Sequence, residues 1–293
     1  MVGRHESDAG PQKEQAIARY LKLDREDFER SFGLEPLATR HGLVDHPLLT
    51  LDALGDLADH LPEDRVERLQ GDAPEIVAEG GSDIPDLSPG EVARTIEGNG
   101  LWMVLKNIEQ HPDYKRLLDE TLDEVAPLVL DREGGMILRE GFVFLSSPGS
   151  TTPSHTDPEH NFLLQVMGTK QMNVGRFPDE QTKQLEIEDH VSGGHRNIEW
   201  LPVEPKVFEM NPGDAIYVPP HAPHMVKNGP TASISFSITF RTPALERLQR
   251  VSSINARLRR LGLSPKAPGR RPGADRLKAG TSRALGQVRR VTG

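Results

Sequence analysis

Two short segments of the sequence carry residue types that bind metal ions. His155 and Asp157 stand two residues apart within the run 149–157. On an extended strand, residues i and i+2 point to the same side, so this imidazole and this carboxylate can converge on one point. A histidine from the run 219–224 would complete a set of two imidazoles and one carboxylate. That ligand set leaves three metal positions open and is typical of non-haem Fe(II) sites.

The histidines need to be separated by role, because a lone His-x-Asp pair is a weak signal in a chain with 11 histidines. His221 and His224 both fall in the second segment, and residue type alone leaves both open as the second imidazole. We expect His160 to be a rim or hydrogen-bonding residue, and Asn228, four residues after His224, to make only a turn. The other histidines are expected at solvated, surface or cap positions: His41, His46, His60, His111, His190 and His195.

Composition excludes several classes of site. The 293-residue chain contains no cysteine, which rules out thiolate zinc sites, a thiol nucleophile and disulfides. Its first residues, MVGRHESDAGPQKEQ, are polar and lack the apolar centre of a secretory signal. No apolar run approaches the roughly 20 residues of a membrane-spanning helix. The sequence therefore predicts a soluble cytoplasmic protein with no membrane partner.

Charge is distributed unevenly along the chain. The net charge is −9, but residues 241–293 contain 14 basic and 2 acidic side chains, whereas residues 1–240 contain 21 basic and 42 acidic ones. A basic tail on an acidic body is the result. We expect the tail to be attracted mainly to its own body. Because a nucleic acid would have to approach that acidic body, nucleic acid is an unlikely partner.

The first part of the chain, residues 1–135, is expected to be a mainly helical region that packs on the following domain. We expect disorder over 1–12, irregular chain over 33–47, a strand over 101–106 and a connection over 70–87. Apolar residues at helical spacing predict helices over 13–32, 48–61 and 111–130. A fourth helix is predicted from Ser88, where Ser-Pro-Gly-Glu has the pattern of a capping box, to about residue 97.

The pattern changes near residue 136, where short β-prone runs alternate with Gly and Pro turns. Such spacing predicts an all-β barrel or jelly roll over 136–242. The expected strands are 142–145, 161–166, 171–176, 206–210, 215–218 and 233–240. In the last of them, isoleucine and phenylalanine alternate with serine, as in a half-buried strand. Residues 178–205 are acidic and polar, and we expect them to form an insertion across the barrel mouth.

Residues 243–293 are predicted to form a basic helical tail. Six apolar residues repeat every three or four positions and predict an amphipathic helix: Leu245, Leu248, Val251, Ile254, Leu258 and Leu261. This stripe either packs on the barrel or forms a homodimer through residues 243–262. A Pro/Gly/Arg linker over 264–274 and a weak basic helix over 275–291 follow. We expect residues 264–293 to be mobile or loosely docked.

The sequence resembles a known enzyme family over about a third of its length. The runs GSTTPSHTDPEHNFLLQVMGTKQMNV and NPGDAIYVPPHAPHMVKN, followed by a serine-rich strand, are similar to the JmjC/cupin-like Fe(II)- and 2-oxoglutarate-dependent hydroxylases. The likeness is strongest to the bacterial cupin-like group and to the asparaginyl hydroxylase of the hypoxia response. It implies a mainly β fold with helical flanks, built on a double-stranded β-helix of the cupin (jelly-roll) type.

The resemblance also implies roles for individual residues. His155, Asp157 and His224 match the metal ligands, and His221 falls three residues early for the spacing from Pro219. Three further residues match positions that contact the cosubstrate: Thr152, Asn161 and Lys170. Physical reasoning agrees with the lysine, because a buried dicarboxylate needs a cation at its far end. The implied cofactors are Fe(II), 2-oxoglutarate as cosubstrate, and O2.

The implied activity is an oxygenase, most simply a hydroxylase, acting on a C–H bond of a peptide side chain or a small molecule. Thr156, where related enzymes often have Tyr, and Ala222-Pro223, where aromatic residues are common, depart from the family pattern near the substrate opening. One alternative is a non-catalytic cupin-like binding or regulatory protein, which would be expected to have lost a ligand or the lysine. Another is a cupin metalloenzyme without 2-oxoglutarate, although such sites commonly use three histidines and a glutamate.

Overall fold

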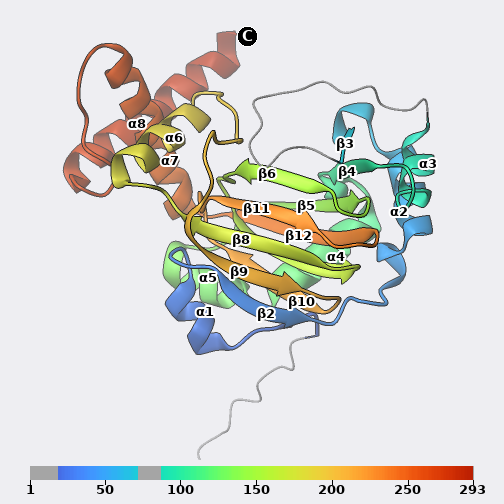
Figure 1. The fold of residues 1–293 in the computed structure, drawn as a ribbon. Coiled ribbons are helices and arrows are strands. Elements are labelled where there is room, and N and C mark those ends of the chain that lie inside the picture. The colour runs from blue at the N-terminus through green and yellow to red at the C-terminus, as the bar shows by residue number, and fades with distance from the viewer. Residues whose placement is uncertain (1–18, 72–86, 293) are drawn as a thin grey trace, which may run out of the picture.

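The strands form two antiparallel sheets that face each other around a common interior (Figure 1). The computed structural model describes residues 19–71 and 87–292. The larger sheet has the order β1 (Leu21–Lys22), β2 (Leu37–His41), β10 (Asp214–Val218), β7 (His160–Met167), β12 (Ser233–Arg241), β5 (Ile137–Ser146), β4 (Leu101–Lys106) and β3 (Val66–Gln70). The smaller sheet has the order β6 (Thr151–His155), β11 (His224–Asn228), β8 (Lys170–Arg176) and β9 (Val203–Met210). The expected jelly-roll core is therefore confirmed.

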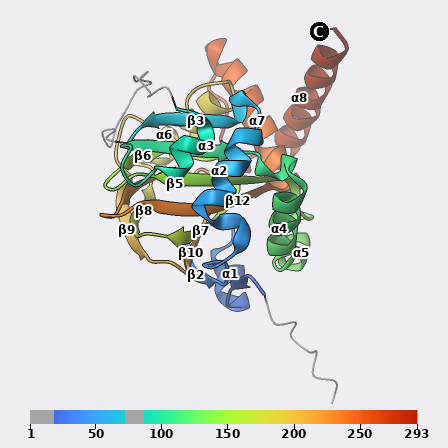
Figure 2. The same cartoon turned by 90° about the vertical axis from the view of Figure 1, so that its right-hand side faces the viewer.

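Helices flank the two sheets. They are α1 (Arg25–Ser31), α2 (Leu51–His60), α3 (Pro89–Arg94), α4 (Pro112–Asp123), α5 (Ala126–Glu133), α6 (Glu180–His190), α7 (Pro243–Arg260) and α8 (Pro272–Thr292). Helices α6, α7 and α8 gather at one end of the sheets, and α2 and α3 lie at the other end (Figure 1). Figure 2 shows α4 and α5 together on one side of the strands. None of the helices in the described residues is long and apolar enough to cross a membrane.

β12 shows how the sequence pattern builds two different environments. Its apolar residues Ile234, Phe236 and Ile238 are buried in the larger hydrophobic core, which also contains residues of the helices. The alternating serines face the opposite way, where Ser235 donates to Gln165 Oε1 at 2.7 Å. The strand was expected to be half-buried, but both faces are buried. The barrel interior accepts a serine face because these hydroxyls find partners there.

The N-terminal region differs from the helical region expected for residues 1–135, because it supplies β1 to β4 to the larger sheet. Of the helix predicted over 13–32, the described part contains β1 and then α1, whose first turn is capped by Asp24. The irregular chain expected over 33–47 contains β2, which pairs with β10. Such pairing joins residues far apart in sequence, so local patterns carry little sign of it. The disorder predicted for 1–12 and most of the connection predicted for 70–87 lie outside the described residues.

Two other predicted helices show how local residues set their ends. The capping box at α3 is present, with Glu91 N bonded to Ser88 Oγ at 3.2 Å and Ser88 N bonded to Glu91 Oε2 at 2.8 Å. The single helix expected over 111–130 is two helices, because the chain breaks between α4 and α5 at residues 124–125. Pro127 explains the break, since proline lacks an N–H and its ring clashes with the carbonyl four residues earlier.

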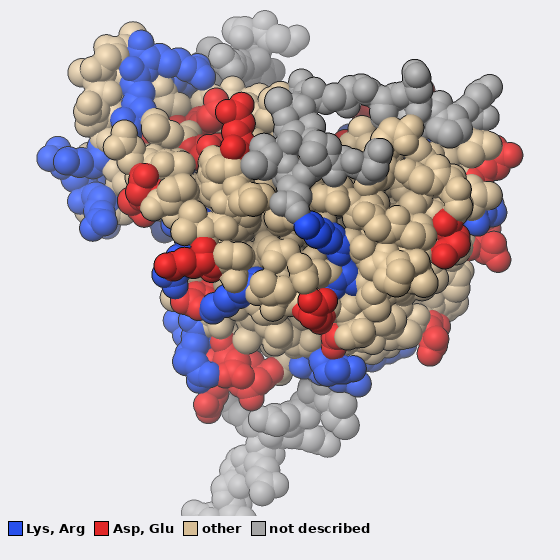
Figure 3. Space-filling model, viewed as in Figure 1, with Lys and Arg blue, Asp and Glu red and all other residues tan. Residues whose placement is uncertain are grey.

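The C-terminal helices hold the acidic insertion in place. Helix α6 forms much of the expected insertion, and Glu188 within it pairs with Arg259 of α7 at 2.7 Å. Helix α8 packs against α7, where Lys278 Nζ donates to Asn255 Oδ1 at 2.6 Å. The tail was expected to be mobile or loosely docked, but its described side chains up to residue 283 include these contacts. In Figure 3, basic side chains gather where α8 lies, with acidic ones beside them.

Candidate metal centre

The end of β6 and the start of β11 bring the two predicted segments together. The strands pair antiparallel, and His224 lies directly opposite His155. Asp157 follows β6 by two residues, so its carboxylate reaches the same place. The ligand atoms of His155, Asp157 and His224 all lie within 4.8 Å of one another, and no other such group was found in the described part of the chain. The structure thus brings together the three side chains expected from the sequence.

The two imidazoles are oriented by their own backbone. His155 Nδ1 lies 2.7 Å from the carbonyl oxygen of Pro153, and His224 Nδ1 lies 2.8 Å from that of Ala222. A carbonyl oxygen only accepts hydrogen bonds, so each Nδ1 carries the hydrogen and each Nε2 keeps a lone pair. His155 Nε2 and His224 Nε2 lie 3.8 Å and 3.5 Å from Asp157 Oδ2. Both lone-pair nitrogens therefore lie on the carboxylate side of the rings.

The electrostatics of this cluster favour the protonation states that a metal ion requires. Burial, and next the neighbouring His224, lower the pKa of His155. Burial alone would raise the pKa of Asp157, but the two histidines and Arg196 hold it below its usual value. A neutral His155 imidazole beside an ionised Asp157 carboxylate is the form in which these two side chains ligate a divalent cation.

Lys170 is buried within the same interior. It begins β8 opposite Asn228 of β11, and it is 4% exposed. Within the described residues it has no ion pair, and burial alone lowers its pKa to about 7. Burying an ammonium without a counter-charge is costly unless an anion joins it. The site therefore suits a ligand carboxylate.

The other two predicted cosubstrate residues also lie on the barrel strands. Thr152 on β6 lies opposite Val226, which on its other side faces Met172 of β8. Val226 and Met172 belong to a small apolar cluster between the two sheets. Asn161 on β7 is buried and accepts a hydrogen bond from Ser237 Oγ at 2.8 Å. Both positions therefore border the interior that contains Lys170.

His221 does not join the metal cluster, so the geometry favours His224 as the second imidazole. The His221 ring is buried, and neither of its nitrogens has a hydrogen-bond partner among the described residues. Its backbone is left-handed, with φ of 60°, a conformation that costs a non-glycine residue roughly 1–2 kcal/mol. Its N–H donates to the carbonyl of Asp157 at 2.6 Å. Burial lowers the pKa of His221 to about 3.

Other histidines show where single-residue expectations fail. His160 makes hydrogen bonds as expected, with Nδ1 2.8 Å from Tyr217 Oη, but it is fully buried and not at a rim. His41 was expected at the surface or in a cap, and it is buried with Nε2 2.7 Å from the carbonyl of Gln165. His190 was expected to be solvated, but it is half-buried, with its ring 6.2 Å from that of His221. His195 is exposed as expected.

Asn228 is a site residue that sequence reasoning missed. Instead of only making a turn, it ends β11 with its side chain buried beside Lys170, and its Nδ2 donates to the Ser150 carbonyl at 3.0 Å. Its Oδ1 has no hydrogen-bond partner among the described residues. The strand period could have found it, because every second residue from His224 points the same way and Asn228 is the second such step.

Comparisons with known proteins find a related domain in the part of the chain that holds this cluster. Residues 130–248 match the family model of the JmjC domain. This segment of the protein is similar to a JmjC domain. A curated relative, Jumonji C domain-containing protein 5 of Drosophila melanogaster, is 30% identical over 104 residues, which cover 32% of this chain and 26% of that protein. The match thus spans about a quarter of the relative's length.

Solved structures share the fold of this chain. A structure of the ribosomal oxygenase YcfD from Escherichia coli in complex with cobalt and 2-oxoglutarate has 20% identity and a TM-score of 0.51. It covers 86% of this chain and 61% of that one. A second structure of E. coli ycfD has 20% identity and a TM-score of 0.54, and covers 91% of this chain and 68% of that one. The likeness extends beyond the JmjC segment to the flanking helices.

Proposed function

We propose that this protein is an Fe(II)- and 2-oxoglutarate-dependent oxygenase that hydroxylates a C–H bond of a peptide side chain or a small molecule. One observation supports this most strongly. A cluster of two histidines and one aspartate shares a barrel with a buried lysine that lacks a counter-charge among the described residues. The cluster suits a divalent cation with open positions, and the lysine suits a carboxylate.

The donor chemistry fits the implied cofactors. His155, Asp157 and His224 would hold Fe(II) through two Nε2 lone pairs and a carboxylate oxygen. Lys170 would pair with a carboxylate of 2-oxoglutarate, with Thr152 and Asn161 lining the same interior. When bound, these cofactors supply the oxidation: O2, 2-oxoglutarate and R–H give R–OH, succinate and CO2.

The chain itself positions and shields these groups. The carbonyls of Pro153 and Ala222 fix both imidazole rings before any metal arrives, so little reorganisation is needed on binding. The apolar cluster between the sheets excludes water and strengthens the attraction between Lys170 and an anion. Asn228 packs beside Lys170, and Ser150 holds its amide in place.

Succinate formation tests this proposal directly. Protein loaded anaerobically with Fe(II) and then given 2-oxoglutarate and O2 should form succinate, measured by NMR. Asp157→Ala should abolish this conversion, because it removes the carboxylate ligand. Lys170→Met should weaken 2-oxoglutarate binding by about 10- to 150-fold, the equivalent of roughly 1.5–3 kcal/mol for one charge-assisted contact.

A matched control is Lys227→Met, which removes an exposed lysine of the same strand pair. It should leave succinate formation unchanged. A wild-type protein that binds Fe(II) and 2-oxoglutarate but forms no succinate, alone or with a panel of candidate peptides and metabolites, would instead be a non-catalytic cupin-like binding protein.

A further inference from the structure

Two adjoining cavities lie beside the turn between β10 and β11 that contains His221. One, of about 230 Å³, is enclosed by α6, α7 and the chain before β11. The other, of about 330 Å³, continues from it, and both are lined by Glu180, Lys183, Pro220 and His221. None of the three cluster residues lines either cavity. Together the cavities form a separate groove.

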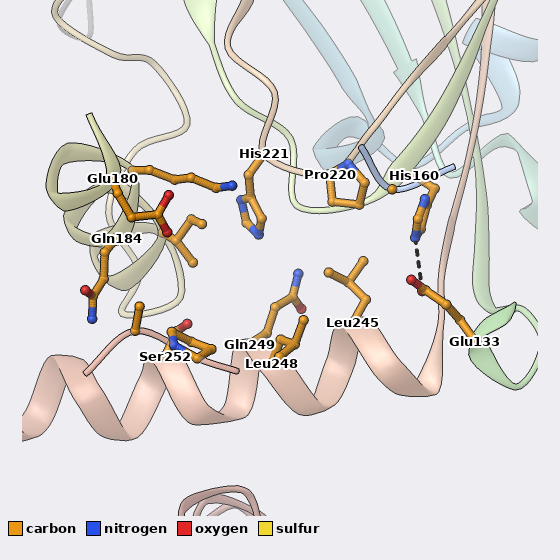
Figure 4. Close-up of a pocket in the computed structure, with 15 residues that line it drawn as sticks. Glu133, His160, Glu180, Gln184, Pro220, His221, Leu245, Leu248, Gln249 and Ser252 are labelled. Carbon is orange, nitrogen blue, oxygen red and sulfur yellow. Dashed lines mark ion pairs between the residues drawn. The ribbon is translucent and has the colours of Figure 1, made fainter. Parts of the chain in front are cut away.

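The imidazole of His221 points into the first cavity, as Figure 4 shows. The residue is 6% exposed, and both of its ring nitrogens lack a hydrogen-bond partner within the described part of the chain. A buried polar group without a partner is costly, so a partner from outside the described chain, such as a ligand, would stabilise it. The left-handed backbone at this residue and its N–H bond to Asp157 hold the ring in this position.

The surroundings of this ring indicate an uncharged ligand. No carboxylate bonds to His221 in the described residues, and a buried imidazole without a counter-charge stays neutral. It then offers one N–H donor and one acceptor nitrogen. Side chains of both signs line the groove, with Glu180 and Lys183 in both cavities and Arg176 and Asp179 in the second.

The opposite wall of the first cavity is partly apolar, with Gln249 and Ser252 beside its leucines. Leu245 and Leu248 rise from α7 on the side facing His221 (Figure 4), and Ile187 of α6 completes the wall. Leu248 is 44% exposed, so its side chain is accessible to a ligand in the cavity that it lines. This wall would bury an aliphatic group while the imidazole bonds a neighbouring polar group.

We propose that the groove at His221 binds an aliphatic group attached to an uncharged amide. An amide supplies both the acceptor and the donor that the imidazole lacks, and the leucine wall supplies the apolar contact. The chemistry fits either a leucine-like residue within a peptide or a free small amide. That this ligand is part of the oxidised substrate rests on the proposed function, since the His221 loop is bonded to the backbone of Asp157.

Binding of N-acetyl-leucinamide tests the site without iron or 2-oxoglutarate. Protein carrying isotope-labelled histidine should show a shift of the His221 ring nitrogens by NMR as this probe is added. N-acetylglycinamide lacks the aliphatic group, and N-acetyl-leucine replaces the amide with a carboxylate. Both should bind at least about tenfold more weakly, a difference of about 1.4 kcal/mol.

Substitutions locate the binding. Leu248→Asp places a charge on the exposed apolar wall, and His221→Gly removes the ring at a position whose left-handed backbone suits glycine. Each should weaken the probe at least about tenfold. The matched control is Leu277→Asp on α8, because Leu277 is 74% exposed and lines neither cavity. This variant should bind the probe with unchanged affinity. If His221→Gly fails to fold, the affinity of Leu248→Asp for the probe tests the inference by itself.

Three results would overturn the inference: no shift at His221, equal affinity in Leu248→Asp and wild type, or tighter binding of the carboxylate probe than of the amide. The affinity of a longer capped peptide that contains leucine distinguishes the two sources of the ligand. Tighter binding of that peptide assigns the groove to polypeptides, and equal binding assigns it to small amides. Because the binding experiment uses neither iron nor 2-oxoglutarate, failure of the proposed oxygenase reaction would leave its result unaffected.

Discussion

At the scale of single residues, the choice between His221 and His224 is the sharpest point. His224 directs its Nε2 toward Asp157, whereas the His221 ring points into the neighbouring groove. The difference comes from the backbone: His224 begins a strand, and His221 sits in a left-handed turn three residues earlier. Residue type alone does not identify which histidine is the ligand, but the pairing of β6 with β11 places His224 opposite His155.

We expect His224→Ala to lose its affinity for Co²⁺, measured by calorimetric titration. Removing a ligand should cost at least as much as the roughly 10- to 100-fold that follows loss of an outer hydrogen-bond partner. His221→Gly should keep the wild-type affinity, because its ring does not reach the cluster. The reverse pattern, with His221 required and His224 dispensable, would show that the ligand assignment is wrong.

We expect 2-oxoglutarate affinity to fall as pH rises through about 7. Burial lowers the pKa of Lys170 to about 7, so above this pH the ligand-free protein holds a neutral amine. Binding a carboxylate then requires uptake of a proton, and the loss of affinity approaches about tenfold per pH unit. Competition binding with Co²⁺ present would measure it. Lys170→Arg, which stays charged, should flatten the dependence, and a flat wild-type profile would contradict the prediction.

Much of the candidate site could be predicted because its residues lie close together in sequence. His155 and Asp157 stand two residues apart, so local spacing indicated that they converge, although β6 ends at His155. The role of Lys170 was implied by the family resemblance. The buried position of His41 could not be predicted in this way, and the strand period places Asn228 on the side of His224 without showing that Lys170 is its neighbour. Their environments depend on which strands become neighbours, and a single sequence does not specify that pairing.

At the scale of elements, the turn between β7 and β8 sets the position of Lys170. Gly168 in this turn has φ of 68°, and a Cβ there would lie 2.1 Å from the carbonyl oxygen of Ala232. We expect Gly168→Ala to lower the free energy of unfolding by more than about 2 kcal/mol, since the conformation alone costs roughly 1–2 kcal/mol. Urea unfolding would measure this.

A matched control exists elsewhere in the chain. A Cβ added at Gly98 would meet no atom within 4 Å, and the φ of this residue is not positive. Gly98→Ala should change stability by under about 1 kcal/mol, and any change should be stabilising because the unfolded chain loses freedom. Equal effects of the two substitutions would show that the Gly168 turn is not constrained as described.

The helices and strands that neighbouring residues determine were predicted, and those that depend on distant parts of the chain were not. The capping box at Ser88 and the alternating strand over 233–240 were found because neighbouring residues determine them. The break at Pro127 was missed because the apolar stripe of the helix continues across it. Strands β1 to β3 were missed because each gains stability by adding to a sheet edge rather than from its own pattern.

At the scale of the whole molecule, the basic tail is an addition to a site that is complete without it. We expect truncation after Gly262 to leave Co²⁺ affinity intact, since the cluster residues lie on β6, β11 and the chain after β6. Arg259 remains and still pairs with Glu188. Stability should fall modestly, because Asn255 loses its bonds to Lys266 and Lys278. Loss of metal binding would show that the tail belongs to the core.

The homodimer expected through residues 243–262 remains a prediction. Leu245 and Val251 of the stripe are buried within the chain itself, where α7 packs mainly on α8 and α6. Leu248 and Leu261 stay exposed and could still form a seam. Light scattering at micromolar concentration would test this, and a monomeric mass for the full chain would exclude the dimer.

The hydrogen bonds of the two cluster histidines have a consequence for protein engineering. Each ring is held by the carbonyl two residues earlier in the chain, Pro153 in β6 and Ala222 in the turn before β11, so no distant element is needed to orient it. The residues that orient the two rings therefore lie in two short segments that can be transferred together. Copying 153–157 and 222–224 onto any antiparallel pair, with His155 placed opposite His224, should transfer a preorganised cation site to an unrelated scaffold.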